Sequence, residues 1–154
     1  MDHAIWRGSG RIVGFREAIT VCIQDYYTFS GRARRSEYWW FFLFLLVASN
    51  LLAVVDVIVF GEGMVLGLSG LFALLALIPQ LAVAWRRMHD TGRPGWFNLL
   101  PMVPTVPLFI IGSGDPAPVL VLMYGSVALM IVVLVWLALP SQPMPNRFGP
   151  ETPP

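Results

Sequence analysis

The sequence predicts an all-α membrane protein: a bundle of four transmembrane helices with both termini in the cytoplasm. The first observation is composition, because 56% hydrophobic and 12% charged residues with a mean hydropathy of +0.69 are too apolar for a soluble domain of 154 residues. The second is the presence of four long apolar runs. The third is that every basic residue falls on one side of the membrane once those runs are drawn as spans, and cytoplasmic segments collect arginine.

The basic residues occupy the segment before the first run, the connection between the second and third, and the tail after the fourth. They are Arg7, Arg11, Arg16, Arg32, Arg34, Arg35, Arg86, Arg87, Arg93 and Arg147. In the other two connections the charged residues are acidic: Glu62 in one and Asp115 in the other. The inner segments hold ten arginines against six carboxylates, a net charge of +4, which is too small for a nucleic-acid surface. It favours a modest attraction to anionic lipid headgroups, so membrane lipids are expected partners and nucleic acid is not.

The cytoplasmic N-terminal segment, residues 1–38, contains an amphipathic helix over 12–29. Its apolar residues recur at spacings of three and four: Ile12, Phe15, Ile19, Cys22, Tyr26 and Phe29. Charged residues interrupt this segment too often for a span, so the helix either lies in the inner headgroup region or packs against the bundle. The single cysteine, Cys22, excludes an internal disulfide and is expected to be an apolar filler. We expect no cleavable signal peptide, because the first apolar run is too long for its core.

The membrane domain covers residues 39–139, with spans at about 39–60, 64–85, 96–111 and 119–139. A run of about 22 residues crosses a hydrocarbon core of about 30 Å. The very short turn at 61–63 predicts a hairpin of the first two spans. The third run contains Pro101, Pro104 and Pro107, so we expect it to be kinked or partly irregular. The proline-rich tail, 140–154, is expected to be extended and cytoplasmic.

Catalytic patterns are weak. Residues 67–70, Gly-Leu-Ser-Gly, resemble the serine motif of intramembrane proteases, yet no span contains the histidine that would activate Ser69. His89 and Asp90 are adjacent, so on a helix their side chains diverge by about 100°, and no further histidine or cysteine is near enough to complete a metal site. We therefore expect no enzyme activity, no cofactor and no metal.

Three polar residues lie within the spans: Asn50 near mid-membrane, Asp56 near the outer end and Gln80 near the inner end. Intramembrane polar groups are functional candidates, because a charge at the centre of a span costs about 2.5 to 3.5 kcal/mol on insertion scales. Asp56 is close enough to the boundary to be an ordinary interfacial carboxylate. Asn50 is expected to form an interhelical hydrogen bond.

Three inner segments carry a recognisable signature: residues 29–40, 86–96 and 146–150. Together they resemble the domain-of-unknown-function 805 family, small bacterial inner-membrane proteins also called YhaH-like. The resemblance covers about residues 12–150 and implies several spans in the bacterial inner membrane. It implies no activity, because the family is defined without one.

All three segments lie at the inner ends of spans, where their polar side chains can meet. We hypothesise a cytoplasmic cap in which arginines hydrogen-bond Glu37, Asp90 and helix-terminal carbonyls while Asn146 and Arg147 close over them. The residues of the predicted cap are Gly31, Arg32, Arg35, Glu37, Arg86, Arg87, His89, Asp90, Asn146 and Arg147. The alternative is that these arginines are only topology signals and lipid anchors.

The sequence favours a non-enzymatic accessory or scaffold subunit, in contact with a larger membrane protein complex, anionic lipid or further copies of itself. The alternative is a small oligomeric transporter or permeation component that uses Asn50, Asp56 and Gln80. A water-accessible cavity that reaches Asn50 would favour transport, and a packed interior would favour the accessory role. An enzyme acting on lipid at the inner face, which would depend on His89, Asp90 and the arginines, ranks third.

Overall fold

The computed structural model describes residues 14–61, 67–107 and 116–150. Its elements are α2 (Phe15–Gln24), α3 (Arg35–Phe60), α4 (Leu68–Asp90), the 3₁₀ helix η1 (Gly95–Thr105) and α6 (Pro116–Ala138). Within these ranges the chain is helical and forms no strand, which confirms the all-α prediction. Parts of the sequence predictions, at residues 1–13, 62–66, 108–115 and 151–154, lie outside the described residues.

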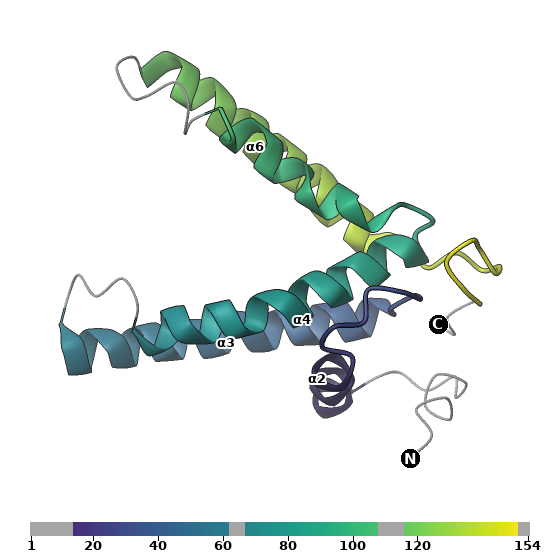
Figure 1. Cartoon of the computed structure of the whole chain (residues 1–154), viewed down its shortest axis with the longest axis horizontal. Helices are drawn as coiled ribbons and strands as arrows, with labels where there is room; N and C mark the ends of the chain where they lie inside the picture. Colours follow the sequence, from purple (N-terminus) through teal and green to yellow (C-terminus); the bar gives the residue numbers. More distant parts are fainter. Residues whose placement is uncertain (1–13, 62–66, 108–115, 151–154) are drawn as a thin grey trace.

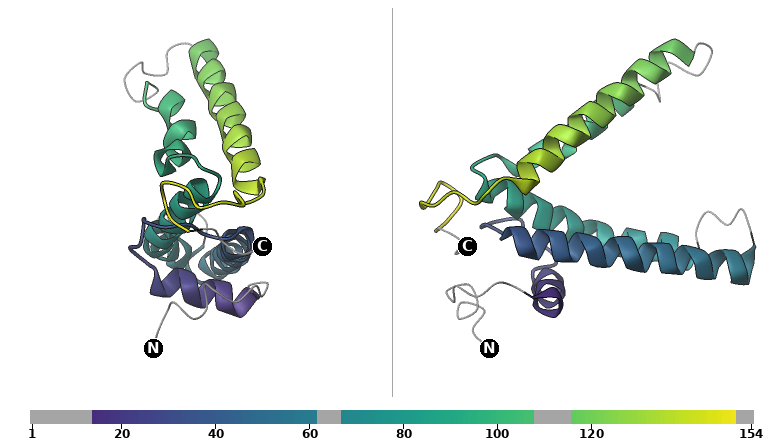
Figure 2. Two further views of the ribbon diagram at one scale, coloured as in Figure 1. Left: turned by 90° about the vertical axis from the view of Figure 1, so that its right-hand side faces the viewer. Right: turned by 180° about the vertical axis from the view of Figure 1, so that it is seen from behind.

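Two helical arms diverge from a common end (Figure 1). One arm is the α3–α4 hairpin and the other is η1 beside α6, and the two views of Figure 2 show the same pairing. We call the common end the vertex: α3 and η1 begin there, and α4 and α6 end there. Helix α2 crosses the α3–α4 arm close to the vertex.

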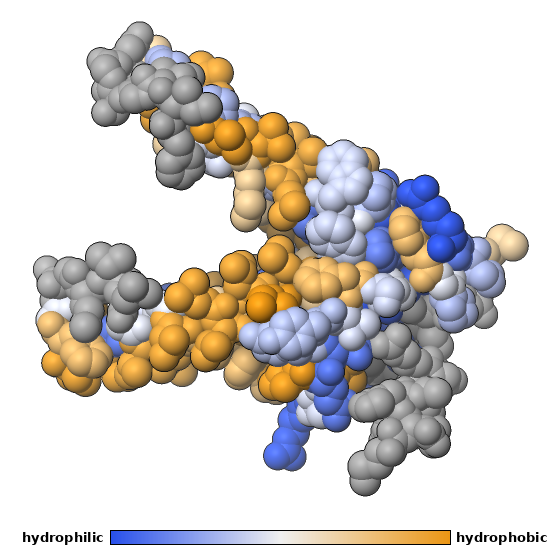
Figure 3. All heavy atoms as spheres, in the orientation of Figure 1, coloured by the Kyte–Doolittle hydropathy of each residue, from blue (hydrophilic) through white to orange (hydrophobic). Residues whose placement is uncertain are grey.

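Three helices are long and apolar enough to span a membrane, among the residues that are described. They are Arg35–Phe60, Leu68–Asp90 and Ala117–Ala138, with mean hydropathies of 2.5, 1.9 and 2.6. The 26 residues of α3 extend for about 39 Å, enough to cross a hydrocarbon core of about 30 Å. Apolar side chains cover both arms, whereas polar ones gather at the vertex (Figure 3).

The second and third predicted spans differ from the observed elements. Helix α4 continues past 85 to Asp90, because Arg86 and Arg87 are buried at the vertex rather than solvated in a loop. The chain then turns through 91–94. In place of an α-helical span over 96–111, the described part forms η1, which is too short to cross alone. Pro101 and Pro104 explain this irregularity, since each lacks the N–H that an α-helix requires.

Helix α2 is shorter than the predicted 12–29 segment. It ends at Gln24, and residues 25–27 form a turn. Its buried residues are Ala18 and Cys22, and the Phe15 ring packs edge-to-face on Trp40 of α3 at a centroid distance of 5.8 Å. The apolar stripe predicted from the spacing therefore supplies the contact with the α3–α4 arm.

Candidate functional site

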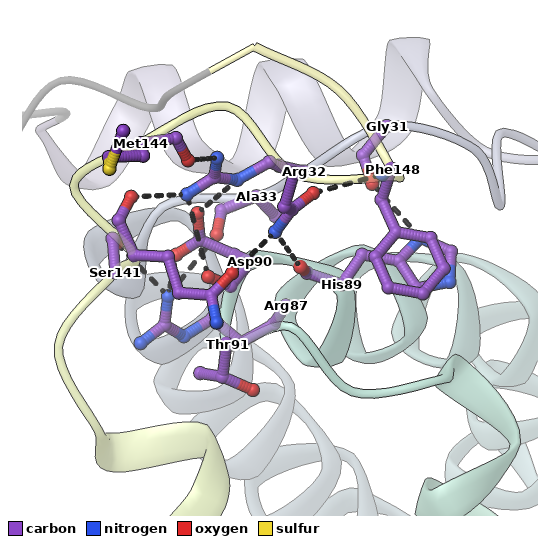
Figure 4. Close-up of polar contacts among 12 residues, drawn as sticks. Gly31, Arg32, Ala33, Arg87, His89, Asp90, Thr91, Ser141, Met144 and Phe148 are labelled. Atoms are coloured by element: carbon purple, nitrogen blue, oxygen red, sulfur yellow. Dashed lines mark hydrogen bonds and ion pairs between the residues drawn. The ribbon is translucent and has the colours of Figure 1, made fainter.

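The vertex contains a polar cap that is built around the carboxylate of Asp90. We define the polar cap by Arg32, Arg87, His89, Asp90 and Asn146. The Asp90 side chain is completely buried; Oδ1 accepts a hydrogen bond from Arg32 Nε at 2.9 Å, and Oδ2 accepts one from Arg87 Nη1. Both guanidinium groups are themselves buried, and Figure 4 draws their contacts with the carboxylate. One carboxylate thus joins the segment that precedes α3 to the last turn of α4, and the paired charges offset the cost of burial.

The remaining donors of Arg32 bind the C-terminal tail. Its Nη1 donates to the carbonyl of Met144 at 3.0 Å, and its Nη2 donates to the carbonyl of Gln142 at 2.7 Å. The Gln142 N–H in turn donates to the Asp90 carbonyl at 3.1 Å. All three nitrogens of the Arg32 guanidinium therefore bind acceptors of the chain itself.

Two arginines bind the C-terminal carbonyls of α6. Arg87 Nε donates to the carbonyl of Leu137 at 3.0 Å, Arg87 Nη2 donates to that of Leu139, and Arg35 donates to that of Ala138. The last carbonyls of a helix have no partner within the helix and carry its negative dipole end. These contacts attach α6, and with it the second arm, to the first.

His89 and Asn146 close the polar cap. The Nδ1 of His89 lies 3.0 Å from the Gly31 carbonyl; since a carbonyl only accepts, Nδ1 carries the proton. The imidazole stacks on Phe148 with a centroid distance of 3.9 Å and an interplanar angle of 2°. Asn146 Nδ2 donates to the His89 carbonyl at 2.9 Å. Arg147, also predicted here, instead places its guanidinium over the Phe148 ring at 4.6 Å.

Arg86 has a different partner from those predicted. Its Nη1 donates to Asp25, just beyond α2, at 2.6 Å. Cys22 is buried nearby, and this burial raises the pKa of its thiol to about 12. Glu37 is buried in the first turn of α3, where the helix dipole favours a carboxylate. The sequence did not indicate Asp25 as the partner of Arg86, because the position of Asp25 relative to α4 depends on how α2 crosses the arm.

A second contact of the α2 region satisfies a carbonyl that a proline leaves free. Pro79, inside α4, has no N–H to donate to the carbonyl of Leu75 four residues earlier. The hydroxyl of Tyr26 donates to this Leu75 carbonyl instead. Proline in a transmembrane helix is tolerated when a neighbouring group satisfies the freed carbonyl. Pro79 indicates from the sequence that a carbonyl of α4 is left free, but it does not indicate which side chain donates to that carbonyl.

Asp56 caps the beginning of α4, at the far end of the first arm. Its carboxylate accepts the N–H groups of Leu68 and Ser69 at 2.7 and 2.8 Å and the Ser69 hydroxyl at 2.5 Å. A Cβ on Gly67 would overlap the carboxylate, so glycine is needed there for this close approach. Ser69, which the protease-like pattern singled out, is a donor to Asp56. An anion at a helix N-terminus is favoured by the free N–H groups and the dipole.

The other two intramembrane residues lie apart from Asp56. Asn50 donates from Nδ2 to the Leu46 carbonyl of its own helix at 2.7 Å, in place of the interhelical bond that was predicted. Gln80 is half-buried in α4, and its Oε1 is buried without a hydrogen-bond partner among the described residues. Asn50 faces a hollow of about 390 Å³ between α3 and α4, which neither Asp56 nor Gln80 lines. Its lining residues are Ser49, Asn50, Ala53, Ser69, Gly70 and Ala73.

The geometry of the polar cap limits its chemistry. Asp90 is engaged by two guanidinium groups, and His89 is held between the Gly31 carbonyl and the Phe148 ring, so the two do not act as a pair. In the described part of the chain, no three His, Cys, Asp or Glu side chains are grouped to hold a metal ion. The site can lock backbone segments together, but it presents no activated nucleophile to a substrate.

This chain is similar to known bacterial inner membrane proteins. Inner membrane protein YhaH of Escherichia coli K12 is 31% identical over 134 residues, which are 84% of this chain and 90% of YhaH. Inner membrane protein YhaI of the same strain is 40% identical over 85 residues, 54% of this chain and 70% of YhaI. No solved structure matches significantly. The family profile described as "Protein of unknown function (DUF805)" matches residues 26–150, and the chain belongs to this family.

Proposed function

We propose that this protein is a non-enzymatic accessory or scaffold subunit of the bacterial inner membrane whose lateral surface contacts another membrane protein. The observation that carries the proposal is the use of the buried arginines. All three nitrogens of Arg32 and of Arg87 donate to acceptors of the chain itself. These two arginines are thereby committed to holding the arms, and most of the helix surface that is left for interactions is apolar.

The proposed topology has four crossings with both termini in the cytoplasm. Helix α4 ends at the vertex, whereas α6 begins at the far end of its arm and returns to the vertex. The 3₁₀ helix η1 runs from the vertex alongside α6, so we assign the third crossing to the chain between Asp90 and Pro116. The described arginines gather near the vertex, which supports its placement on the cytoplasmic side. The inner-membrane names of YhaH and YhaI support the location.

One observation favours the alternative of a permeation component. The hollow beside Asn50 is the kind of feature a transport path would use. Against this, Asp56 is engaged by the α4 N-terminus, and Gln80 lies away from the hollow. A path that needs all three residues is not assembled in a single copy.

Two measurements on the full chain test the proposal. Native mass spectrometry of mildly solubilised bacterial membranes should find the chain with one other membrane protein in fixed stoichiometry, and tagging that protein should recover the chain. In liposomes that contain a pH-sensitive dye, the purified chain should give the proton and solute flux of empty vesicles. Flux above that level, or recovery of the chain only alone, only with lipid or only with copies of itself, would contradict the role.

A further inference from the structure

Asn50 places a carboxamide in the middle of the membrane on an exposed face of α3. It lies 15 residues after Arg35, the first residue of the helix, which is about 22 Å along the axis. Its side chain is exposed, and the neighbouring exposed residues of α3, such as Leu46, Leu51 and Val54, are apolar. In the proposed topology, the medium that surrounds the chain at this depth is hydrocarbon.

The hydrogen-bonding capacity of Asn50 exceeds what its own helix satisfies. A carboxamide offers two N–H donors and an oxygen with two lone pairs. In the described part of the chain, its bond is the one from Nδ2 to the Leu46 carbonyl. Lipid tails can neither donate nor accept, so the oxygen and the second N–H favour a protein partner.

The hollow beside Asn50 has the lining of a helix-packing surface. Ser49 and Ala53 on α3, together with Ser69, Gly70 and Ala73 on α4, keep the two backbones accessible. Small residues of this kind let another helix approach closely, and a polar side chain among them adds an interhelical hydrogen bond. The volume of about 390 Å³ can hold several apolar side chains.

We propose that this hollow is a self-association surface that receives α3 of a second copy, with the two Asn50 carboxamides paired across a twofold axis. A twofold axis brings the same residue of each copy face to face, and a carboxamide is its own complement, since it both donates and accepts. A lipid chain would fill the volume but leave the amide unpaired. This pairing goes beyond the scaffold role, because it names a contact between copies and holds or fails separately from any contact with another protein.

Cysteine cross-linking in membranes tests the surface. In a Cys22→Ala background, Ala53→Cys places a thiol in the hollow, and the matched control Val55→Cys places one on an exposed position of the same turn about 200° away. With copper phenanthroline as the oxidant, Ala53→Cys should give a disulfide-linked dimer and Val55→Cys should not. Equal dimer from both positions, or none from Ala53→Cys, would overturn the proposal, as would an Ala53→Cys adduct to a different protein.

A second substitution isolates the carboxamide. Asn50→Leu in the Ala53→Cys background keeps the side chain volume similar while removing both hydrogen-bonding functions. The apparent dimerisation constant, measured by dilution of the protein in detergent micelles, should weaken by about threefold to thirtyfold. Thermal unfolding of the Asn50→Leu protein shows whether each copy still folds. An unchanged constant in a folded variant would show that Asn50 does not hold the copies together.

Discussion

Each end of the α3–α4 arm contains a buried carboxylate, and the two make different kinds of contact. Asp56, at the far end, accepts N–H groups and a hydroxyl from residues 68 and 69, only 12 and 13 positions along the chain. Asp90, at the vertex, accepts from Arg87 in its own helix and from Arg32, 58 positions away. Asp56 closes one hairpin, whereas Asp90 joins segments that would otherwise be independent.

The difference explains where the arms are held together. At the vertex, Arg32 and Arg87 extend from Asp90 to the tail and to the end of α6, so that one network spans both arms. The carboxylate at the far end contacts a single arm. In a membrane, lipid tails are as apolar as the helix surfaces, so apolar contact alone gives little driving force between arms. A buried polar network at one end supplies the specificity instead.

Asp90→Asn should have the largest effect on stability. It removes the negative charge between two buried guanidinium groups and leaves both uncompensated, at a cost of about 3 to 5 kcal/mol. The same substitution at Asp25, whose side chain is 21% exposed and pairs with Arg86, should cost clearly less because solvent screens that pair. The measurement is thermal unfolding in detergent, followed by near-ultraviolet circular dichroism. Equal unfolding midpoints for the two variants would refute the central position of Asp90.

Gly67→Ala tests the contact at the far end. The added methyl would occupy the position of the Asp56 carboxylate and displace it from the α4 N-terminus, for a loss of about 1 to 2 kcal/mol. Gly125→Ala is the matched control, because its nearest neighbours, atoms of Pro104, lie at 3.9 Å. That control should be neutral or slightly stabilising, since alanine is the better helix former. Both variants are compared by the shift of their thermal unfolding midpoints. If the Gly67→Ala protein were as stable as the Gly125→Ala protein, the contact between Asp56 and the α4 N-terminus would contribute nothing to stability.

Tyr26→Phe tests how α2 is attached near the vertex. Loss of the hydroxyl leaves the Leu75 carbonyl without its donor and should cost about 1 to 2 kcal/mol. In a Pro79→Ala background the helix regains its own N–H for that carbonyl, so the same change should cost less. The free energy of unfolding of the two single variants and the double variant gives the coupling. Additive costs would show that Tyr26 and Pro79 act independently.

Cys22 gives the smallest effect. With its pKa raised to about 12, only about one thiol in 10⁴ is ionised at pH 8, so N-ethylmaleimide should react only after denaturation. Because burial raises the pKa of this thiol from its ordinary value of 9.0 to about 12, the free energy of unfolding keeps its full value below pH 9 and falls as the pH rises toward 12. Ile23→Cys with Cys22→Ala is the control, since residue 23 is exposed on the same helix and should react quickly. Equal labelling rates in the folded proteins would show that Cys22 is accessible.

Local features of the sequence predicted the helices well and their contacts less well. The length and apolarity of the runs predicted α3, α4 and α6, because a span is defined by local hydropathy. The run at 96–111 was expected to be irregular from its prolines, and η1 agrees within the described part. The end of α4 was predicted five residues too early, because charged residues are interpreted as solvated unless their buried partners are known.

The candidate site depended more on tertiary arrangement. The motif residues predicted which segments meet, and the structure brings Arg32, Arg87, His89, Asp90 and Asn146 together. The partner of Arg86 could not be predicted, since Asp25 reaches it only through the crossing of α2. The role of Phe148 was likewise missed, because stacking on His89 depends on the path of the tail.

The central claim is that the Asp90 network fixes the angle between the arms. Double electron–electron resonance, which measures the distance between two spin labels, tests this claim most directly. The labels are attached to Ile58→Cys and Val121→Cys in the Cys22→Ala protein, because these two exposed positions lie on different arms. A control pair, Ile58→Cys with Leu71→Cys, reports on one arm alone. We predict one narrow distance distribution for each pair, and Asp90→Asn should broaden the distribution between the arms while the control pair stays narrow. An unchanged distribution between the arms in the Asp90→Asn protein would contradict the account.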